Sequence, residues 1–273
     1  INEGERIKVE SVKIIGAKNI SELRIRQHME SKGSWLFFKN FYDEAAFASD
    51  LDAVRQLYVS YGYFDAKVRR GEFEWFSGKK SVRPAIVIEE GNRYRIGDIE
   101  VKGTTYFSPV EVREPFSKLK GQPYQVSDVA RAIERVRSLY GNEGFVLTEV
   151  NEDYTFDTDA AKVNILIEID ERQRVHVGDV VIERSAPVVD EAEQGVFSRL
   201  YSRVSPPVKD ETIKREVRLK SGDVYRKNME RQTVDRLERL GIFESVEARG
   251  EPTADDHVQN LVLEVEEGVT GNF

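Results

Sequence analysis

The feature that most constrains the fold of this chain is a pattern that recurs three times along its 273 residues. Similar segments with alternating apolar residues begin at Arg6, Arg93 and Arg174, which are spaced by roughly 80 to 90 residues. Self-similarity at such a period indicates one small structural unit that the chain repeats. We therefore expect three consecutive domains and not a single large one.

Each repeat opens with a predicted strand. In the first repeat the apolar positions are Ile7, Val9, Val12 and Ile14, so the alternation shifts phase once between Val9 and Val12. A half-buried strand shows a period of two residues, and a single phase shift is typical of a bulge or a bend. The opening strand of each repeat is therefore predicted to contain a bulge or a bend.

A glycine that follows an apolar-periodic helical segment is the second recurring marker, at Gly62, Gly144 and Gly241. Glycine can adopt the left-handed conformation that closes a helix. The residues four, eight and eleven positions before the glycine are apolar in the first two repeats. In the third repeat two of these positions hold Thr233 and Glu230, so its apolar stripe is expected to be rotated onto Val234 and Met229.

After the glycine, each repeat has room for two strands joined by a hairpin turn, and before the helix it has room for another helix. Ser21 and the Ser108–Pro109 pair are typical starts of that first helix. The unit is thus β-α-α-β-β, an α+β fold. Each copy is predicted to form a three-stranded mixed sheet covered by two antiparallel helices, with the third strand central and the second strand on an edge.

The predicted domains are residues 1–91, 92–172 and 173–268, and residues 269–273 begin a link to a further part of the protein. The third domain contains an insertion at 186–207, which is expected to be a capping segment or a binding loop. Because the chain begins at Ile1 inside an apparent segment, we expect it to be a fragment of a longer protein. It has no apolar run of about 18 residues that could span a bilayer as a helix.

Composition argues against catalysis and against binding of nucleic acid. The chain has no cysteine, and its three histidines, His28, His176 and His257, lack the spacing of metal ligands. We expect no catalytic residue, no cofactor and no metal site. The 49 acidic and 41 basic residues are intermixed, whereas a nucleic-acid surface needs a basic face. An RNA-binding KH-like repeat protein is a distant alternative, because no GxxG loop joins the helices.

The repeated unit resembles the POTRA domain, the polypeptide-transport-associated module. The resemblance rests on four segments: Ile1–Gly4 with Ile14–Gly16, the stretch LDAVRQLYVSYGYF at Leu51–Phe64, the stretch VDRLERLGIFESV at Val234–Val246, and Glu266–Phe273. Their order is similar to that of the last three POTRA units of BamA-like outer-membrane β-barrel assembly factors. The insertion and Arg184, which replaces the glycine seen at Gly16 and Gly103, depart from the pattern. A TamA-like translocation factor, or another polypeptide transporter, is the alternative.

This resemblance implies a scaffold at the periplasmic face of the outer membrane. Its partners would be unfolded outer-membrane β-barrel proteins, accessory lipoproteins and a C-terminal membrane β-barrel of the same protein, which Gly271, Asn272 and Phe273 would join. The predicted fold adds a mechanism, because an edge strand can pair with an incoming strand by β-augmentation. The predicted edges are 63–69, 145–150 and 242–248. Their candidate binding residues are Tyr63, Phe64, Ala66, Val68, Arg69, Phe145, Val146, Val150, Phe243 and Val246.

Overall fold

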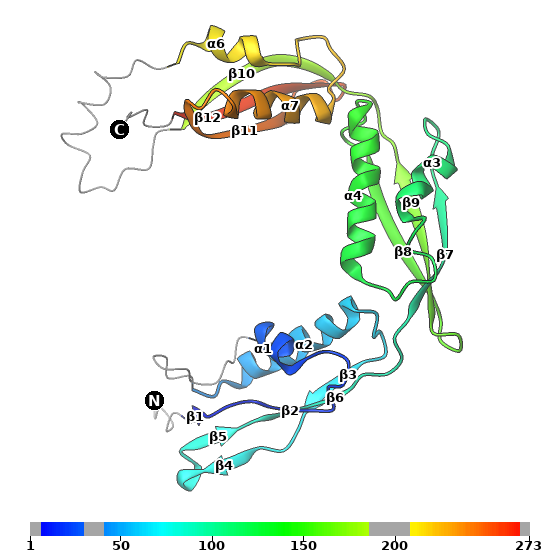
Figure 1. Ribbon diagram of the computed structural model, residues 1–273, viewed down its shortest axis with the longest axis vertical. Coiled ribbons are helices and arrows are strands. Elements are labelled where there is room, and N and C mark those ends of the chain that lie inside the picture. Colours follow the sequence, from blue (N-terminus) through cyan, green and yellow to red (C-terminus); the bar gives the residue numbers. More distant parts are fainter. Residues whose placement is uncertain (1–6, 30–40, 186–207, 268–273) are drawn as a thin grey trace, which may run out of the picture. The chain divides into compact units, whose positions relative to one another are not determined.

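The computed structural model describes residues 7–29, 41–185 and 208–267 (Figure 1). The chain divides into two compact units. The N-terminal unit comprises the described residues up to Glu100 together with Arg113–Ala132 and Glu152–Leu166. The C-terminal unit comprises Val101–Val112, Ile133–Asn151 and the described residues from Ile167. The division therefore falls inside the middle repeat, and each unit contains the junction between two successive repeats.

The first repeat forms a mixed sheet whose strands are interrupted, with both helices on one side of it (Figure 1). Its elements are β1 (Lys8–Val9), β2 (Lys13–Ile15), α1 (Glu22–Gln27), α2 (Glu44–Ser60), β3 (Lys67–Arg70), β4 (Glu74–Phe76), η1 (Ser77–Lys79), β5 (Ser81–Arg83) and β6 (Ala85–Glu89). The strand orders are β1-β5-β4 and β2-β6-β3, with β5 and β6 central. Each central strand pairs in parallel with the opening strand and antiparallel with the edge strand.

The interruptions in the three strands of this sheet lie opposite one another. Pro84 separates β5 from β6 and has no N–H to donate. Backbone hydrogen bonds still hold the gap together, because Lys13 N–H donates to the Pro84 carbonyl (2.9 Å) and Gly71 N–H donates to the Ala85 carbonyl (2.7 Å). The irregularity expected in the opening strand is thus confirmed. It is a break between β1 and β2, and it coincides with breaks in the other two strands that divide the sheet in two.

The other two repeats have the same element order with continuous strands. The middle repeat consists of β7 (Arg95–Lys102), α3 (Pro109–Arg113), η2 (Glu114–Phe116), α4 (Val126–Asn142), β8 (Glu149–Asp157) and β9 (Lys162–Asp170), in the sheet order β7-β9-β8. The third repeat consists of β10 (His176–Ser185), α6 (Asp210–Glu216), α7 (Lys227–Glu238), β11 (Phe243–Pro252) and β12 (Val258–Glu267), in the order β10-β12-β11. The predicted α+β class with three-stranded mixed sheets is confirmed.

Local sequence signals explain where the helices begin. The Ser21 hydroxyl accepts from Arg24 N–H at the start of α1, and the Asp43 carboxylate accepts from Ala46 N–H (2.9 Å) at the start of α2. Ser108 and Glu111 form a reciprocal capping box before α3. Gly62, Gly144 and Gly241 all have positive φ, as their places after the second helices predict.

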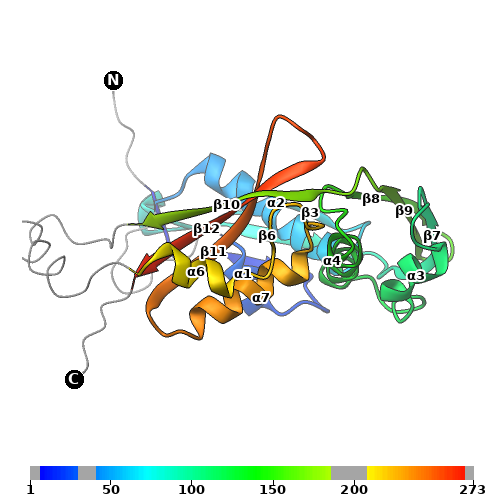
Figure 2. The same ribbon diagram turned by 90° about the horizontal axis from the view of Figure 1, so that it is seen from above.

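The expected rotation of the third helix stripe was wrong. Glu230 and Thr233 are 7% and 0% exposed, so α7 buries the same positions as the helices of the other repeats. The polar groups of both side chains have hydrogen-bond partners within the third repeat, which offsets the cost of removing them from water. The Thr233 hydroxyl accepts from Arg218 N–H (3.0 Å), and the Glu230 carboxylate accepts from the Tyr225 hydroxyl (2.6 Å) and from Lys227. Helices α6 and α7 lie on one side of their sheet (Figures 1 and 2).

Among the residues described, none of the helices is both long and apolar enough to cross a membrane. The predicted insertion at 186–207 and the predicted junction residues Gly271, Asn272 and Phe273 lie outside the described residues. The loops between the two helices of the middle and third repeats end on buried side chains, Tyr124 (4% exposed) and Tyr225 (0%).

Candidate functional site

Each sheet has two outer strands, and the opening strand is partly covered along its edge. The start of the opening strand is paired with the loop between the two helices. In the middle repeat Ile96 N–H donates to Gln122 (2.8 Å) and Gly121 N–H donates to Ile96 (2.7 Å). The third repeat repeats this arrangement with Val177 and Asp223. The edges on the other side of the sheets are formed by β3 and β4 in the first repeat, β8 in the middle repeat and β11 in the third.

The edge of the first repeat is divided between two short strands, β3 and β4, and β3 is rich in charge. Strand β3 is four residues long and contains Val68 and Arg69, both predicted as binding residues. Arg69 pairs with Glu89 on the neighbouring strand (3.1 Å). Arg70 pairs with Glu44 (2.6 Å) and lies over the Phe73 ring. Both arginines thus have partners inside the repeat, which suits a role in preventing self-pairing of this edge better than a free charged contact.

The edge strands of the other two repeats are long. Strand β8 has nine residues and β11 has ten. Both continue well beyond the predicted edges at 145–150 and 242–248. Val150, Phe243 and Val246 lie in these strands, as predicted, and Val150 and Val246 face inward with 3% and 6% exposure. Val150 therefore offers a partner mainly its backbone.

Tyr63, Phe64 and Ala66 lie before β3, so their assignment to an edge strand was wrong. After Gly62 the chain first turns, with Tyr63 N–H bonded to the Tyr58 carbonyl (3.0 Å) and Ala66 N–H bonded to the Tyr63 carbonyl (3.1 Å). Tyr63 and Ala66 are buried at 5% and 6% exposure. Phe64 contributes instead to an aromatic cluster with residues of the next repeat. The cluster joins the Phe64 ring to Tyr94, Tyr124 and Phe156, with centroids 4.8 to 5.4 Å apart.

Gly62 completes this junction. Its carbonyl accepts a hydrogen bond from Tyr94 N–H (2.8 Å), and its φ is +87°. A side chain here would also meet the carbonyl oxygens of Tyr124 (3.0 Å) and Tyr94 (3.2 Å). The glycine that ends the helix thus also allows the backbone of the next repeat to pack closely against it.

Phe145 and Val146 also lie before their edge strand, β8, and form the second junction. The Gly144 carbonyl accepts from Val175 N–H (2.9 Å), and the Arg174 guanidinium lies 5.2 Å from the rings of both Phe145 and Tyr106. Val146 packs against the core of the third repeat. The assignment of these two residues to an edge strand was therefore wrong. Their apolar side chains contact the third repeat.

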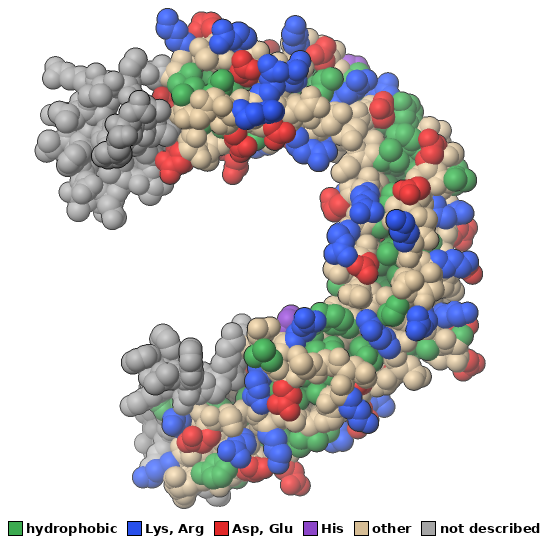
Figure 3. Space-filling model, in the orientation of Figure 1, with side chains coloured by type: hydrophobic (Ala, Val, Ile, Leu, Met, Phe, Trp, Pro, Cys, Tyr) green, Lys and Arg blue, Asp and Glu red, His purple; other side chains and the backbone are tan. Residues whose placement is uncertain are grey.

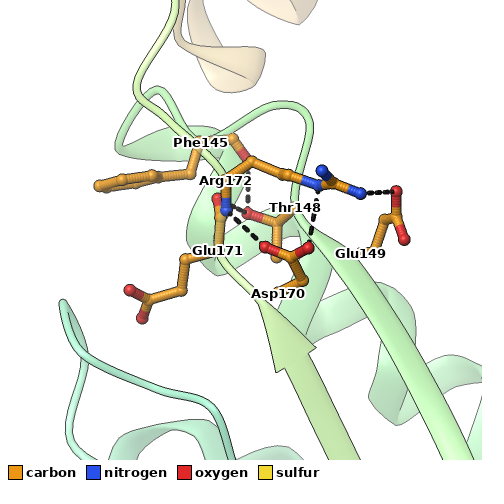
Figure 4. Close-up of polar contacts among 6 residues, drawn as sticks. All are labelled: Phe145, Thr148, Glu149, Asp170, Glu171 and Arg172. Carbon is orange, nitrogen blue, oxygen red and sulfur yellow. Dashed lines mark hydrogen bonds and ion pairs between the residues drawn. The ribbon is translucent and has the colours of Figure 1, made fainter.

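Figure 4 shows how the turn after β9 is held at this junction. The Thr148 hydroxyl lies within hydrogen-bond distance of the carbonyls of Phe145 (2.8 Å) and Glu171 (3.0 Å). Arg172, which has positive φ, pairs through its side chain with Asp170 (3.0 Å) and Glu149 (2.7 Å). The turn is thereby attached to the start of the edge strand β8.

Two buried carboxylates, Glu90 and Glu171, occupy the same place at the end of the central strand in the first and middle repeats. We call them the repeat glutamates. Glu90 accepts from the backbone N–H groups of Lys18 (2.8 Å) and Asn19 (2.9 Å), and from the Tyr58 hydroxyl (2.9 Å). Each carboxylate therefore ties the loop after the opening strand to the second helix.

Glu171 makes the matching contacts, with Thr105 N–H (2.8 Å), Tyr106 N–H (2.9 Å) and the Tyr140 hydroxyl (2.8 Å). Burial alone would raise the pKa of both carboxyl groups, but the hydrogen bonds from these backbone and hydroxyl donors outweigh it, so both pKa values lie below the ordinary one. The pKa values of Tyr58 and Tyr140 are raised, first by burial and then by the hydrogen bond that each hydroxyl donates to its carboxylate. Neither glutamate was predicted as a functional residue.

Acid should loosen these loops. A carboxyl whose folded pKa is depressed stabilises the fold fully above its unfolded pKa of about 4.3, and this stabilisation is lost as the pH falls through the folded value. We expect hydrogen exchange of the 17–29 segment, corrected for its intrinsic pH dependence, to accelerate below about pH 4. In Glu90→Gln the exchange should already be faster at pH 7 and should no longer respond to acid. An unchanged acid response in that variant would contradict the assignment.

The described residues offer little for chemistry. His28, His176 and His257 are exposed, and within 7–29, 41–185 and 208–267 no three His, Asp or Glu side chains gather closely enough to hold a metal. Acidic and basic side chains are intermixed on the face shown in Figure 3. The prominent features are therefore the edges and the junctions.

Comparison with known proteins agrees with this arrangement. The POTRA family model, described as "Surface antigen variable number repeat", matches residues 7–91, 94–172 and 205–268. The BamA outer membrane protein assembly factors of Neisseria meningitidis and Nitratidesulfovibrio vulgaris are each 22% identical, over 93% and 99% of this chain. The chain spans about a third of the length of these curated relatives (30% and 32%).

Among solved structures, POTRA3-5 of Haemophilus influenzae BamA has a TM-score of 0.66 and 23% identity, and the match covers 96% of both chains. This likeness concerns the fold. The family match extends over all three repeats and over well more than half of the chain. The chain therefore belongs to the POTRA family.

Proposed function

We propose that this chain is a periplasmic scaffold in an outer-membrane protein assembly machine. It binds unfolded β-barrel clients and accessory proteins, and it does so by adding their extended segments to its edge strands. Backbone pairing accommodates many client sequences, since every residue other than proline presents the same N–H and C=O groups. The chain is thus a binding scaffold and not an enzyme.

The observation that carries this proposal is the open edge of each sheet. Strands β8 and β11 present nine and ten residues along an edge, whereas the opening strands are paired at their start by the interhelical loops. The matched relatives are named as outer membrane protein assembly factors, which supports this class of client and a location in the outer-membrane envelope.

The partners and the domain limits belong to the same proposal. We assign the domains to 1–91, 92–172 and 173–268, with the family matches at 7–91, 94–172 and 205–268 in support. Accessory lipoproteins and the C-terminal membrane β-barrel of the same protein are the further partners, proposed from the resemblance alone. The lipoproteins are taken to contact the edge strands, and Gly271, Asn272 and Phe273 to join the barrel.

Hydrogen exchange tests the proposal directly. On addition of an outer-membrane β-barrel protein diluted from urea, we expect amides of at least one of β3, β4, β8 and β11 to become protected, because added strands take up their free N–H groups. A water-soluble helical protein diluted in the same way serves as the control. If the client protects none of these four strands, binding by strand addition is wrong.

A further inference from the structure

One position on the second helix differs between the repeats in a way that changes the edge beside it. Seven residues before the helix-end glycine stand Arg55, Arg137 and Val234. In the middle repeat the Arg137 guanidinium reaches from α4 to the edge strand β8 and donates to the Val150 carbonyl (3.4 Å). Val234 has neither the length nor a donor to do so. The space between helix and edge strand is therefore bridged in the middle repeat and unbridged in the third.

A groove of about 600 Å³ lies at that place in the third repeat, between α7 and β11. Its apolar lining comes from Val234, Val246 and Ala248. Val246 is 6% exposed and forms the floor of the groove, whereas Val234 and Ala248 are half-buried and remain accessible from solvent. It has room for an apolar side chain from a strand that lies beside β11.

Asn228, at the start of α7, and Gln232 also line the groove and add polar side chains to it.

The outward side of β11 is acidic. Glu247 and Glu251 are exposed, and no donor to either carboxylate occurs within the described residues. The one basic residue between them, Arg249, is engaged by Glu183 (2.7 Å) and Glu264 (3.2 Å). Opposite charges directly across a strand pair stabilise it, and like charges destabilise it. A strand that pairs with β11 should therefore place lysine or arginine opposite these glutamates.

We propose that the α7–β11 groove of the third repeat binds, as an added strand, an extended peptide that alternates apolar and basic side chains. The apolar side chains enter the groove against Val234 and Val246, and the basic ones face Glu247 and Glu251. This inference rests on the proposed function and specifies which edge takes the client and which client sequences bind best.

The probe is a labelled ten-residue peptide of alternating lysine and valine, which matches the ten residues of β11. Binding to the whole chain is measured by fluorescence anisotropy, and the bound site by hydrogen exchange. We expect protection at β11. Val234→Arg and the uncharged Val234→Gln should each weaken binding at least about tenfold, because they fill the groove that one apolar side chain would occupy. Exchange in the β10 and β12 segments reports whether each variant stays folded.

Three matched comparisons make the test specific. A peptide with glutamate in place of lysine, and a lysine–valine peptide N-methylated at alternate residues on the pairing side, should both bind at least about tenfold more weakly. Arg137→Val should create new protection at β8. Equal binding of either control peptide, or of both Val234 variants, overturns the inference.

Failure here is distinguishable from failure of the proposed function. An unfolded outer-membrane protein that protects β3 or β8 but leaves β11 unchanged contradicts this inference and leaves the scaffold role standing. A client that protects no edge, while the lysine–valine peptide protects β11, contradicts the scaffold role and supports the groove.

Discussion

Replacing Glu171 by alanine is expected to destabilise the middle repeat by about 3 to 5 kcal/mol, because it removes the shared acceptor of several buried neutral donors. The carboxylate is 9% exposed and accepts from Thr105 N–H, Tyr106 N–H and the Tyr140 hydroxyl. Without it four donors lose their acceptor, since the Thr105 hydroxyl also donates to Glu171, and each buried unsatisfied donor costs about 1 to 3 kcal/mol.

Hydrogen exchange should detect this loss where a global melting curve would not, since a chain of several domains need not unfold in one step. We expect faster exchange in the 101–112 and 133–151 segments of Glu171→Ala. Glu168→Ala, on the same strand but exposed, is the matched control and should change exchange little. Equal effects of the two substitutions would show that the buried hydrogen bonds are not what stabilises this loop.

Gly103→Ala is expected to have a comparable effect through the backbone. Gly103 has φ of +83°, and a Cβ there would overlap the carbonyl oxygen of Ile169 on the central strand. The left-handed conformation costs an L-residue about 1 to 2 kcal/mol, and forced overpacking adds about 1 to 3 kcal/mol. The variant should therefore lose about 2 to 5 kcal/mol of stability in the middle repeat.

Gly121→Ala separates these two causes. Gly121 has φ of +78° but nothing within 4 Å of a Cβ, so only the conformational cost of about 1 to 2 kcal/mol should remain. Urea titrations followed by hydrogen exchange can rank the two variants. If Gly121→Ala is as harmful as Gly103→Ala, the close approach to Ile169 contributes nothing.

The third repeat shows how the chain manages without this glycine. Arg184 stands there, and its guanidinium pairs with Glu267 (3.4 Å), which ends the central strand, and with Asp210 (2.7 Å). Leu237 occupies the place of Tyr58 and Tyr140 in this repeat, so the hydroxyl that these tyrosines supply is missing there. Arg184 donates to the carboxylate in the third repeat, as the tyrosine hydroxyl does in the other two. The departure seen in the sequence thus comes with a compensating change.

Much of the fold was predictable because it is encoded locally. Alternation of apolar residues reports a strand, and a glycine after an apolar-periodic segment reports a helix end. These signals predicted the element order and the positive φ of Gly62, Gly144 and Gly241, all of which are confirmed. The candidate site was predictable only in part, since Val68, Arg69, Val150, Phe243 and Val246 do lie in edge strands.

The errors concern residues whose role depends on another repeat. Tyr63, Phe64, Phe145 and Val146 are apolar and adjoin a strand, which is the pattern of an edge as well as of a junction. Phe64 joins the junction because Tyr94, Tyr124 and Phe156, as many as 92 positions further along the chain, close around it. Periodicity cannot report such a contact.

The sequence by itself determined three POTRA repeats, their β-α-α-β-β order and the places where helices end, because these follow from backbone preferences and from which face is apolar. Only the tertiary structure decided what the polar side chains do. Glu171 meets donors 65 to 66 residues away, and Val234 leaves a groove because β11 lies beside it. Hydrogen bonds and open grooves depend on distances between segments remote in the chain, which exist only once the fold has closed.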